Sequence, residues 1–361
     1  MVWRKVYLAL SFVIFCSVVL AQGEYPAFEV SYSYGGILRH SKELPEIRKN
    51  RVQGFTVTAA RFHTSKQKWE QCFCYPLIGA GVAVYDFGDP LVLGNSINPF
   101  LFVAPKIFPG GRLHIIPRGG AGLSYVSKVY DANSNPENTF FSSHLSFFLQ
   151  LDISVRYQIT KQLNWQGGVS YNHVSNGGVK QPNKGMNFIT ANAGLNYYLA
   201  TPEIPLYTVD TLTGNNVKWR YAAMTFFSLK VAKPEEGYSR KNGAVFGCIV
   251  KMGYSVPRFS LLTAGIEYVA DMYLQEQLMR AGEEVDFQRI ALLLGHTATF
   301  GKLSFITDLG VYVYSPSKAP DPVYQHYALT YRFGRHLFAG VGLKAHRHVA
   351  ELMLINSGVC F

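Results

Sequence analysis

Long apolar runs are absent from this 361-residue chain beyond its first twenty residues. A transmembrane helix needs about 20 consecutive apolar residues, so the sequence excludes a helical membrane protein. Charged residues are also scarce, at 16%, whereas the chain contains 33 Gly, 23 Tyr and 25 Phe. This balance is unusual for a soluble secreted enzyme and is typical of many short strands with aromatic ends.

Cysteine is nearly absent as well. Cys16 lies in the N-terminal apolar run, which leaves Cys72, Cys74, Cys248 and Cys360 in the remainder of the chain. Cys72 and Cys74 are too close for an easy mutual disulfide, and no second pair has metal-ligand spacing. We therefore expect no bound metal and no cofactor.

The first 21 residues are typical of a secretory signal peptide. Arg4 and Lys5 precede the apolar run 6–20, and Val19-Leu20-Ala21 resembles a cleavage site, so the mature chain is expected to begin at Gln22. Cleavage removes two positive charges and no acid, and the formal net charge falls from +11 to +9. The remaining excess indicates either an anionic partner or ordinary solvated charge.

Alternation of apolar and polar residues recurs from Phe28 to the C-terminus. It predicts an all-β protein, namely a transmembrane antiparallel β-barrel with an even number of about 12 to 16 strands. No linker divides the chain, so residues 22–361 are expected to form one barrel domain. The candidate strands are 28–37, 52–62, 77–87, 99–108, 112–126, 143–158, 162–174, 187–199, 217–232, 242–255, 258–271, 287–299, 302–314, 323–333, 337–346 and 349–361.

Short and long connections alternate between these strands. Thr160-Lys161-Gln162 and Phe300-Gly301-Lys302 are predicted turns, whereas 127–142, 175–186, 200–216 and 272–286 are predicted external loops. The chain ends on Phe361, and a terminal aromatic on a last amphipathic strand resembles the sorting signal of outer-membrane barrels. A signal peptide, repeated strands and this ending together predict the outer membrane of a Gram-negative bacterium.

The strand around 162–174 carries the candidate chemistry. Trp165, Val169 and Tyr171 share the parity of His173 and Ser175, and this apolar face must face lipid in a barrel. By the same parity, Asn187 lies on the lipid face of the next strand. Histidine can accept a serine proton, and an asparagine can orient the imidazole, as in Cys-His-Asn proteases. The pattern predicts Ser175 as nucleophile, His173 as general base and Asn187 as the orienting residue.

The loop after Ser175 supplies further candidates. Small residues there let backbone amides turn toward a developing oxyanion, which favours an oxyanion hole in this loop. Lys180 and Lys184 could contact lipid phosphates, or they could be solvated loop charges. The alternative for the whole motif is structural, because a strand-end His is often an interfacial residue and Ser-Asn-Gly-Gly often forms a turn.

A resemblance adds to this reading. The segment 142–199 resembles the PagL-type lipid A 3-O-deacylases and the longer acyloxyacyl hydrolases, above all in His173-x-Ser175-Asn176-Gly177 and Pro182-Asn183-x-Gly185. It implies an outer-membrane barrel with a membrane-facing triad, in which Ser175 matches the nucleophile, His173 the base, and Asn176 and Gly178 the oxyanion hole. Asn187 occupies the acid position, where the better-known enzymes have Glu.

The resemblance implies a carboxylic ester hydrolase that removes an ester-linked hydroxyacyl chain from the lipid A of lipopolysaccharide in the outer leaflet. Asp86, Asp152, Glu267 and Asp271 are strand acids that could replace the missing carboxylate. Two alternatives stay open: a non-catalytic barrel serving as channel, adhesin or lipid-binding scaffold, and a transferase that adds an acyl chain. No nucleic acid is expected as a partner, and the sequence leaves monomer and homodimer open.

Overall fold

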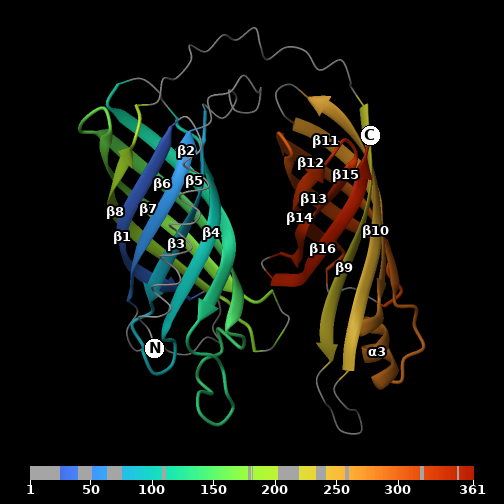
Figure 1. The fold of residues 1–361 in the computed structure, drawn as a ribbon. Coiled ribbons are helices and arrows are strands. Elements are labelled where there is room, and N and C mark those ends of the chain that lie inside the picture. Colours follow the sequence, from blue (N-terminus) through green and yellow to red (C-terminus); the bar gives the residue numbers. More distant parts are fainter. Residues whose placement is uncertain are drawn as a thin grey trace. The chain divides into compact units, whose positions relative to one another are not determined.

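The computed structural model describes residues 25–39, 51–62, 75–107, 111–177, 180, 182–201, 219–232, 241–256, 260–317, 321–347 and 349–361. These residues form two closed antiparallel barrels of eight strands each (Figure 1). The predicted signal peptide 1–21 and Cys72 and Cys74 lie outside the described residues, and Cys248 and Cys360 have free thiols.

The first barrel closes by pairing its first strand with its eighth. Its strands are β1 (Pro26–Leu38), β2 (Val52–Phe62), β3 (Leu77–Asp86), β4 (Asn95–Ala104), β5 (Leu113–Val126), β6 (Leu145–Gln158), β7 (Leu163–Ser175) and β8 (Met186–Tyr198).

The second barrel closes in the same way, between its first and last strands. Its elements are β9 (Trp219–Ala232), β10 (Lys241–Val256), β11 (Ser260–Asp271), helix α3 (Met272–Arg280), β12 (Gln288–Phe300), β13 (Leu303–Tyr314), β14 (Val323–Phe333), β15 (Leu337–His346) and β16 (Val349–Cys360).

The all-β barrel fold and the even strand number predicted from the sequence are confirmed, but the strands do not form one ring. Residues 22–361 were predicted to form a single barrel domain, whereas the chain divides into two compact units, each with a closed barrel. The first ring closes between β1 and β8 and the second between β9 and β16. Both contacts join strands that are far apart in the chain. Local alternation carries no information on where a ring closes.

Side-chain parity determines the two faces of each wall. In β6 the residues Leu145, Leu149, Leu151 and Ile153 are exposed, while Ser146, Phe148, Gln150, Asp152 and Ser154 are buried. Period-two alternation of this kind places apolar side chains outside and mixed side chains in the lumen, which suits a strand that separates lipid from a barrel interior. The outward-facing apolar stripe predicted from the sequence is therefore present.

The interior of the first barrel is filled by side chains. Glu29 on β1 pairs with Arg118 on β5 at 2.5 Å and with Arg156 on β6 at 3.1 Å, so the ion pairs reach from one wall to the opposite wall. Tyr85, Phe148 and Phe188 are fully buried on the same inner face, where the Tyr85 ring packs in a tilted geometry on Phe148 and in a T-shaped geometry on Phe188.

The interior of the second barrel is also bridged by charge. Lys344 on β15 pairs with Glu267 on β11, which lies across the ring, and Lys251 pairs with Asp308. Buried charges are tolerated only when paired, because an unpaired one costs several kcal/mol, roughly, in a low-dielectric interior. Such bridges reduce the free cross-section of the lumen.

Each barrel has two ends, which we name by their connections. In the first barrel the turn end carries the short turn Thr160–Gln162 between β6 and β7, and the loop end carries the β5–β6 and β7–β8 connections. In the second barrel the turn end carries the short β12–β13 connection, and the loop end carries the β11–β12 connection. Most of the predicted external loop 200–216 lies outside the described residues. β8 leads into it from the turn end, where the Tyr198 amide donates to Gln162, so this prediction is wrong about the end from which the chain leaves.

Helix α3 was also missed, because 272–286 was predicted as loop. It starts at Asp271, whose carboxylate accepts the amide of Leu274 at 2.9 Å and so caps the first turn. No helix within the described part of the chain is long and apolar enough to span a membrane.

Candidate functional site

The predicted base and its orienting residue face each other across two strands. His173 on β7 and Asn187 on β8 are register partners. The Nδ1 atom of His173 lies 2.5 Å from Oδ1 of Asn187. An amide oxygen accepts, so Nδ1 carries the proton of this bond, and the contact fixes the ring in one tautomer.

The predicted nucleophile ends the same strand. Ser175 is only 8% exposed and has the parity of His173. Its Oγ accepts a hydrogen bond from Nδ2 of Asn183, at 2.9 Å. Asn183 was part of the quoted motif, but sequence reasoning gave it no role because it lies in the loop, where strand parity does not apply.

The side-chain amide of Asn176 forms hydrogen bonds that hold the loop. Its Nδ2 donates to Oγ of Ser142 at 3.0 Å and to the carbonyl of Lys180 at 2.9 Å. Its backbone N–H donates to Oδ1 of Asn183 at 3.3 Å. Asn183 therefore contacts both the hydroxyl of Ser175 and the first amide after it, which places a donor beside the predicted reacting atom.

Two loops brace each other around this site. Ser142, which is buried in the β5–β6 loop, donates its hydroxyl to the carbonyl of Lys180 at 2.6 Å. The amides of Lys184 and Gly185 donate to the carbonyls of Thr139 and Phe140. The β7–β8 loop is thus held against the β5–β6 loop by backbone and hydroxyl contacts, which positions Asn183.

Gly185 is the close-approach position of the site. It has φ +66°, a left-handed conformation that favours glycine. A Cβ added there would lie 3.2 Å from Cε1 of His173 and 3.3 Å from Cβ of Ser175. Both side chains therefore border the space beside Gly185, and a side chain at this position would crowd them.

The remaining predicted residues are placed less closely. Lys180 and Lys184 are exposed on the loop, and Gly178 lies outside the described residues. Of the four acids considered as substitutes, Asp152 faces the lumen, where Ser154, Ser170 and Asn192 donate to it. Asp86 caps the turn after β3, and Glu267 and Asp271 belong to the second barrel.

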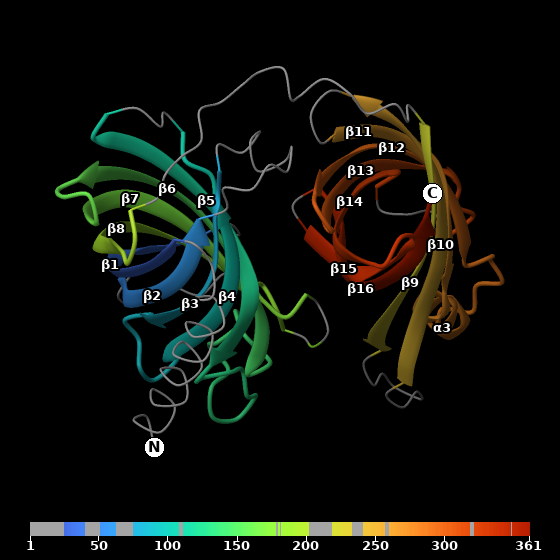
Figure 2. The same cartoon turned by 45° about the horizontal axis from the view of Figure 1, so that its top comes forward.

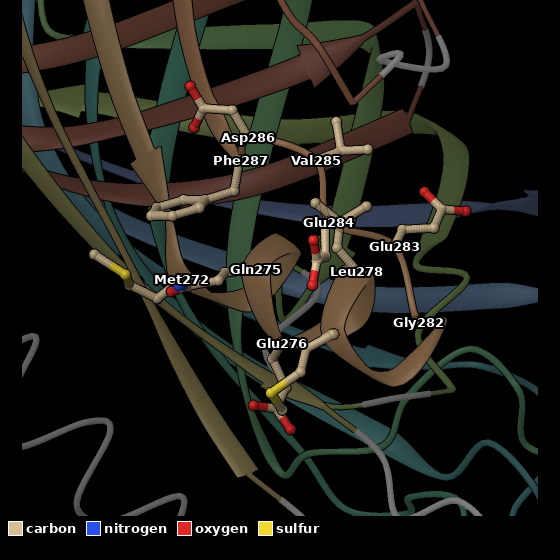
Figure 3. A pocket seen from close by; sticks show the side chains of 11 residues that line it. Met272, Gln275, Glu276, Leu278, Gly282, Glu283, Glu284, Val285, Asp286 and Phe287 are labelled. Carbon is tan, nitrogen blue, oxygen red and sulfur yellow. The ribbon is translucent and has the colours of Figure 1, made fainter.

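The second barrel has a large hollow of its own. In the second barrel, α3 and residues 282–287 line a hollow of about 690 Å³ (Figure 3). Its wall mixes apolar side chains with the carboxylates of Glu276, Glu283, Glu284 and Asp286. Asp286 accepts from the Tyr314 hydroxyl at 2.8 Å and from the Gln288 amide, so part of this charge is used within the loop.

Fold and site together define an outer-membrane β-barrel protein with a Ser-His-Asn arrangement on its outer wall. The family model "Lipid A 3-O-deacylase (PagL)" matches residues 55–196, and "Acyloxyacyl hydrolase, C-terminal domain" matches residues 219–361. The two matches fall on the two barrels and cover most of the chain. The chain belongs to this family of lipid A 3-O-deacylases and acyloxyacyl hydrolases, and it is an outer-membrane protein.

Solved barrel structures are similar only at low identity. Neisserial surface protein A is 10% identical, with 48% of this chain and 95% of that chain covered and a TM-score of 0.30. The attachment invasion locus protein Ail of Yersinia pestis is 9% identical, with 48% and 98% covered and a TM-score of 0.29. The translocator domain of the autotransporter NalP from Neisseria meningitidis is 10% identical, with 99% and 96% covered and a TM-score of 0.19.

Proposed function

We propose that the first barrel removes the 3-O-linked hydroxyacyl chain of lipid A by ester hydrolysis. The observation that carries this proposal is the 2.5 Å contact between His173 and Asn187 on the outer face, with Ser175 two residues along the same strand. A serine hydroxyl is a poor nucleophile at neutral pH until a base accepts its proton. Asn187 engages Nδ1, so Nε2 of His173 is the nitrogen that acts as base.

The reaction runs through an acyl-enzyme. Oγ of Ser175 attacks the ester carbonyl carbon and gives its proton to His173. As the tetrahedral intermediate collapses, the sugar oxygen leaves with that proton. Water then attacks the acyl-enzyme, gives a proton to His173, and the hydroxy fatty acid leaves as Ser175 recovers its hydrogen. Each of the two steps forms a tetrahedral oxyanion, and stabilising this negative charge is the largest requirement of the reaction.

Asn183 is a donor next to the nucleophile. Its Nδ2 donates to Oγ of Ser175 at 2.9 Å, and with substrate bound it would donate instead to the neighbouring ester oxyanion, where one donor contributes about 3 kcal/mol to transition-state stabilisation. Asn176 contributes by holding the loop, and Gly178 is the further donor that the family resemblance suggests. Lys180 and Lys184 are exposed on the same loop, where they can contact the phosphates of lipid A in the outer leaflet.

Mass spectra of lipid A test the proposal. Cells that produce the chain should lose one 3-O-linked chain, and Ser175→Ala should restore the full mass. Ser357→Ala is the matched control. Ser357 is an exposed serine on β16, and within the described residues its hydroxyl forms a hydrogen bond only with Thr225. Loss of the chain in the Ser175→Ala strain would exclude the mechanism, and a gain of acyl mass would indicate a transferase.

A non-catalytic barrel is the second candidate, and the observation that favours it is the amide at position 187. Without a carboxylate the imidazolium of the transition state has no ion-pair partner. A channel is the weaker form of this alternative, because ion pairs between opposite walls bridge both lumens. Purified protein that conducts ions in planar bilayers and releases no fatty acid from lipopolysaccharide would support it.

A further inference from the structure

In the second barrel, backbone pairing between the closing strands β9 and β16 covers only part of their length. We name the contact between these two strands the seam. Backbone pairing between β16 and β9 covers Ile355–Cys360 and Ala222–Phe227, six pairs at the turn end. Within the described residues it does not continue to the loop end, although both strands do. β4 and β5 also have six pairs, but these are spread from Ser96–Val126 to Val103–Gly119. In Figures 1 and 2, β9 runs beside β10 and diverges from β16 toward its far end.

Side chains replace the backbone ladder in the loop-end half of this seam. Oγ of Ser228 donates to the carbonyl of Met353 at 2.6 Å. Two residues further along β9, Nζ of Lys230 lies 3.3 Å from Oε1 of Glu351. The other carboxylate oxygen of Glu351, Oε2, lies 2.9 Å from Nε2 of His346. We name Lys230, Glu351 and His346 the latch.

The latch has incomplete hydrogen bonding. Nδ1 of His346 is buried and has no hydrogen-bond partner among the described residues. Lys230 also lies 3.8 Å from Asp271 and 5.2 Å from the ring of Tyr273 on α3, so several weak contacts share one ammonium group. Strand edges without a ladder are costly in a bilayer because no water satisfies their backbone groups. Such an edge is stable only if something occupies it.

The surroundings of the seam match the polarity of a lipid. Leu229 and Ile355 are 53% and 66% exposed on the outer wall, so acyl chains cover both strands. Behind the seam the lumen presents the apolar side chains of Phe226, Leu352 and Leu354, all buried. Along the seam itself the latch lies toward the loop end, and Phe226 and Leu354 lie deeper. A peptide strand would need no such gradient, and neither would a second copy of the chain.

We propose that the loop-end half of the β9–β16 seam is a lateral binding site for a phosphorylated lipid of the surrounding membrane. A phosphate takes the place of Glu351 on Lys230 and accepts from His346, while one acyl chain lies against Phe226 and Leu354. A phosphate presents three acceptor oxygens, which suits an ammonium and an imidazole side by side. The site is separate from Ser175 and does not depend on ester hydrolysis.

Native mass spectrometry of the full chain tests this site. In detergent, phosphatidylglycerol should be retained as one adduct, whereas diacylglycerol of the same chain length should be retained at least about tenfold less, which corresponds to 1.4 kcal/mol. Lys230→Gln should lower phosphatidylglycerol retention about tenfold, and Glu351→Gln should raise it, because it removes the competing carboxylate.

A disulfide across the seam gives a second readout. The pair Ser228→Cys with Leu354→Cys continues the register by one step and should abolish the adduct when oxidised and restore it when reduced. Ser228→Cys with Val245→Cys is the control, because residues 228 and 245 are register partners in the complete β9–β10 ladder. Folding of each variant is checked by its heat-modifiable migration on gels.

Three outcomes would overturn the site. Equal retention of the charged and the uncharged lipid, unchanged retention in Lys230→Gln, or a concentration-dependent dimer in place of the lipid adduct each contradict it; the dimer would mean that a second copy covers the strand edges. If the 228/354 pair cannot be oxidised, the two Gln variants decide alone. Because the readout is binding, a failed deacylation assay would leave this result unaffected.

Discussion

The two barrels have the same number of strands and differ in where they place polar groups near lipid. In the first, β1 pairs with β8 over twelve residues, and the predicted site residues His173 and Ser175 lie on the outer side of β7. In the second, the closing seam has six pairs, and charged side chains complete it. The proposed ester hydrolysis belongs to the outer face of the first barrel, whereas the proposed lipid site belongs to the closing seam of the second.

The largest effect should separate two histidines. His173→Ala should lower kcat/KM of ester hydrolysis by at least about a thousandfold, because no base remains for Ser175. His326→Ala in the second barrel removes a buried ring that contacts Asp308 at 3.1 Å. It should leave kcat/KM unchanged and lower the free energy of unfolding by about 2 kcal/mol. Fatty-acid release and urea unfolding measure the two effects.

If both variants lose activity equally, the comparison between a catalytic first barrel and a structural second barrel is wrong. The kcat/KM and the free energy of unfolding are compared only for variants that refold and migrate on gels like the native protein.

The next effect concerns the amide at position 187. Asn187→Asp keeps the side-chain shape and places a carboxylate oxygen against Nδ1 of His173, so kcat should rise about tenfold. Asn187→Ala removes the orienting contact of 2.5 Å and should lower kcat about a hundredfold. Single-turnover kinetics on a p-nitrophenyl ester separates acylation from product release. A lower kcat for Asn187→Asp would show that the amide hydrogen, and not the oxygen, matters.

Two glycines with the same backbone sharpen the comparison further. Gly185 and Gly334 have φ +66° and +64°. Alanine at either position should cost about 1 kcal/mol of stability. Only at Gly185 would the new Cβ meet His173 and Ser175, whereas nothing lies within 4 Å at Gly334. Gly185→Ala should therefore lower kcat about tenfold, and Gly334→Ala should leave it unchanged.

The smallest effect is a loop response to acid. Hydrogen bonds from the Ser134 amide and hydroxyl hold the pKa of Asp131 below its usual range, and the amide of Gln288 and the hydroxyl of Tyr314 do the same for the pKa of Asp286. A lowered folded-state pKa means that the contribution is present above the unfolded pKa and is lost as pH falls through the folded value. Acid should loosen both loops.

Hydrogen exchange of residues 131–138 and 283–288 as pH is lowered measures this response. Asp131→Asn should abolish the pH dependence in the first barrel alone, and a response that persists in that variant would assign it to another group.

The sequence predicted the strands better than their closure. The expected ranges 52–62, 323–333 and 337–346 coincide with β2, β14 and β15, because period two and flanking turns are local signals. The segment expected at 99–108 is β4 at Asn95–Ala104 instead. Pro99 inside it removes a ladder donor, which made the start of the strand hard to recognise.

The site was predicted as far as parity reaches. Parity alone brought His173 to Asn187, and the structure pairs them. Asn183 and Ser142 were not assigned, because their contacts with Ser175 and Asn176 depend on how two loops fold over each other. The roles of these residues in catalysis stay predictions. Lumen partners such as Glu29 and Arg118 likewise join strands four places apart in the ring.

Each barrel starts and ends at its turn end, since eight strands return the chain to the side from which it came. In the second barrel the Tyr221 amide near the start of β9 donates to the carbonyl of the terminal Phe361. Each ring is therefore a self-contained cassette. In evolution or in engineering, either ring can be gained, lost or exchanged as a unit, which would let the proposed hydrolysis and the proposed lipid binding be combined as independent parts.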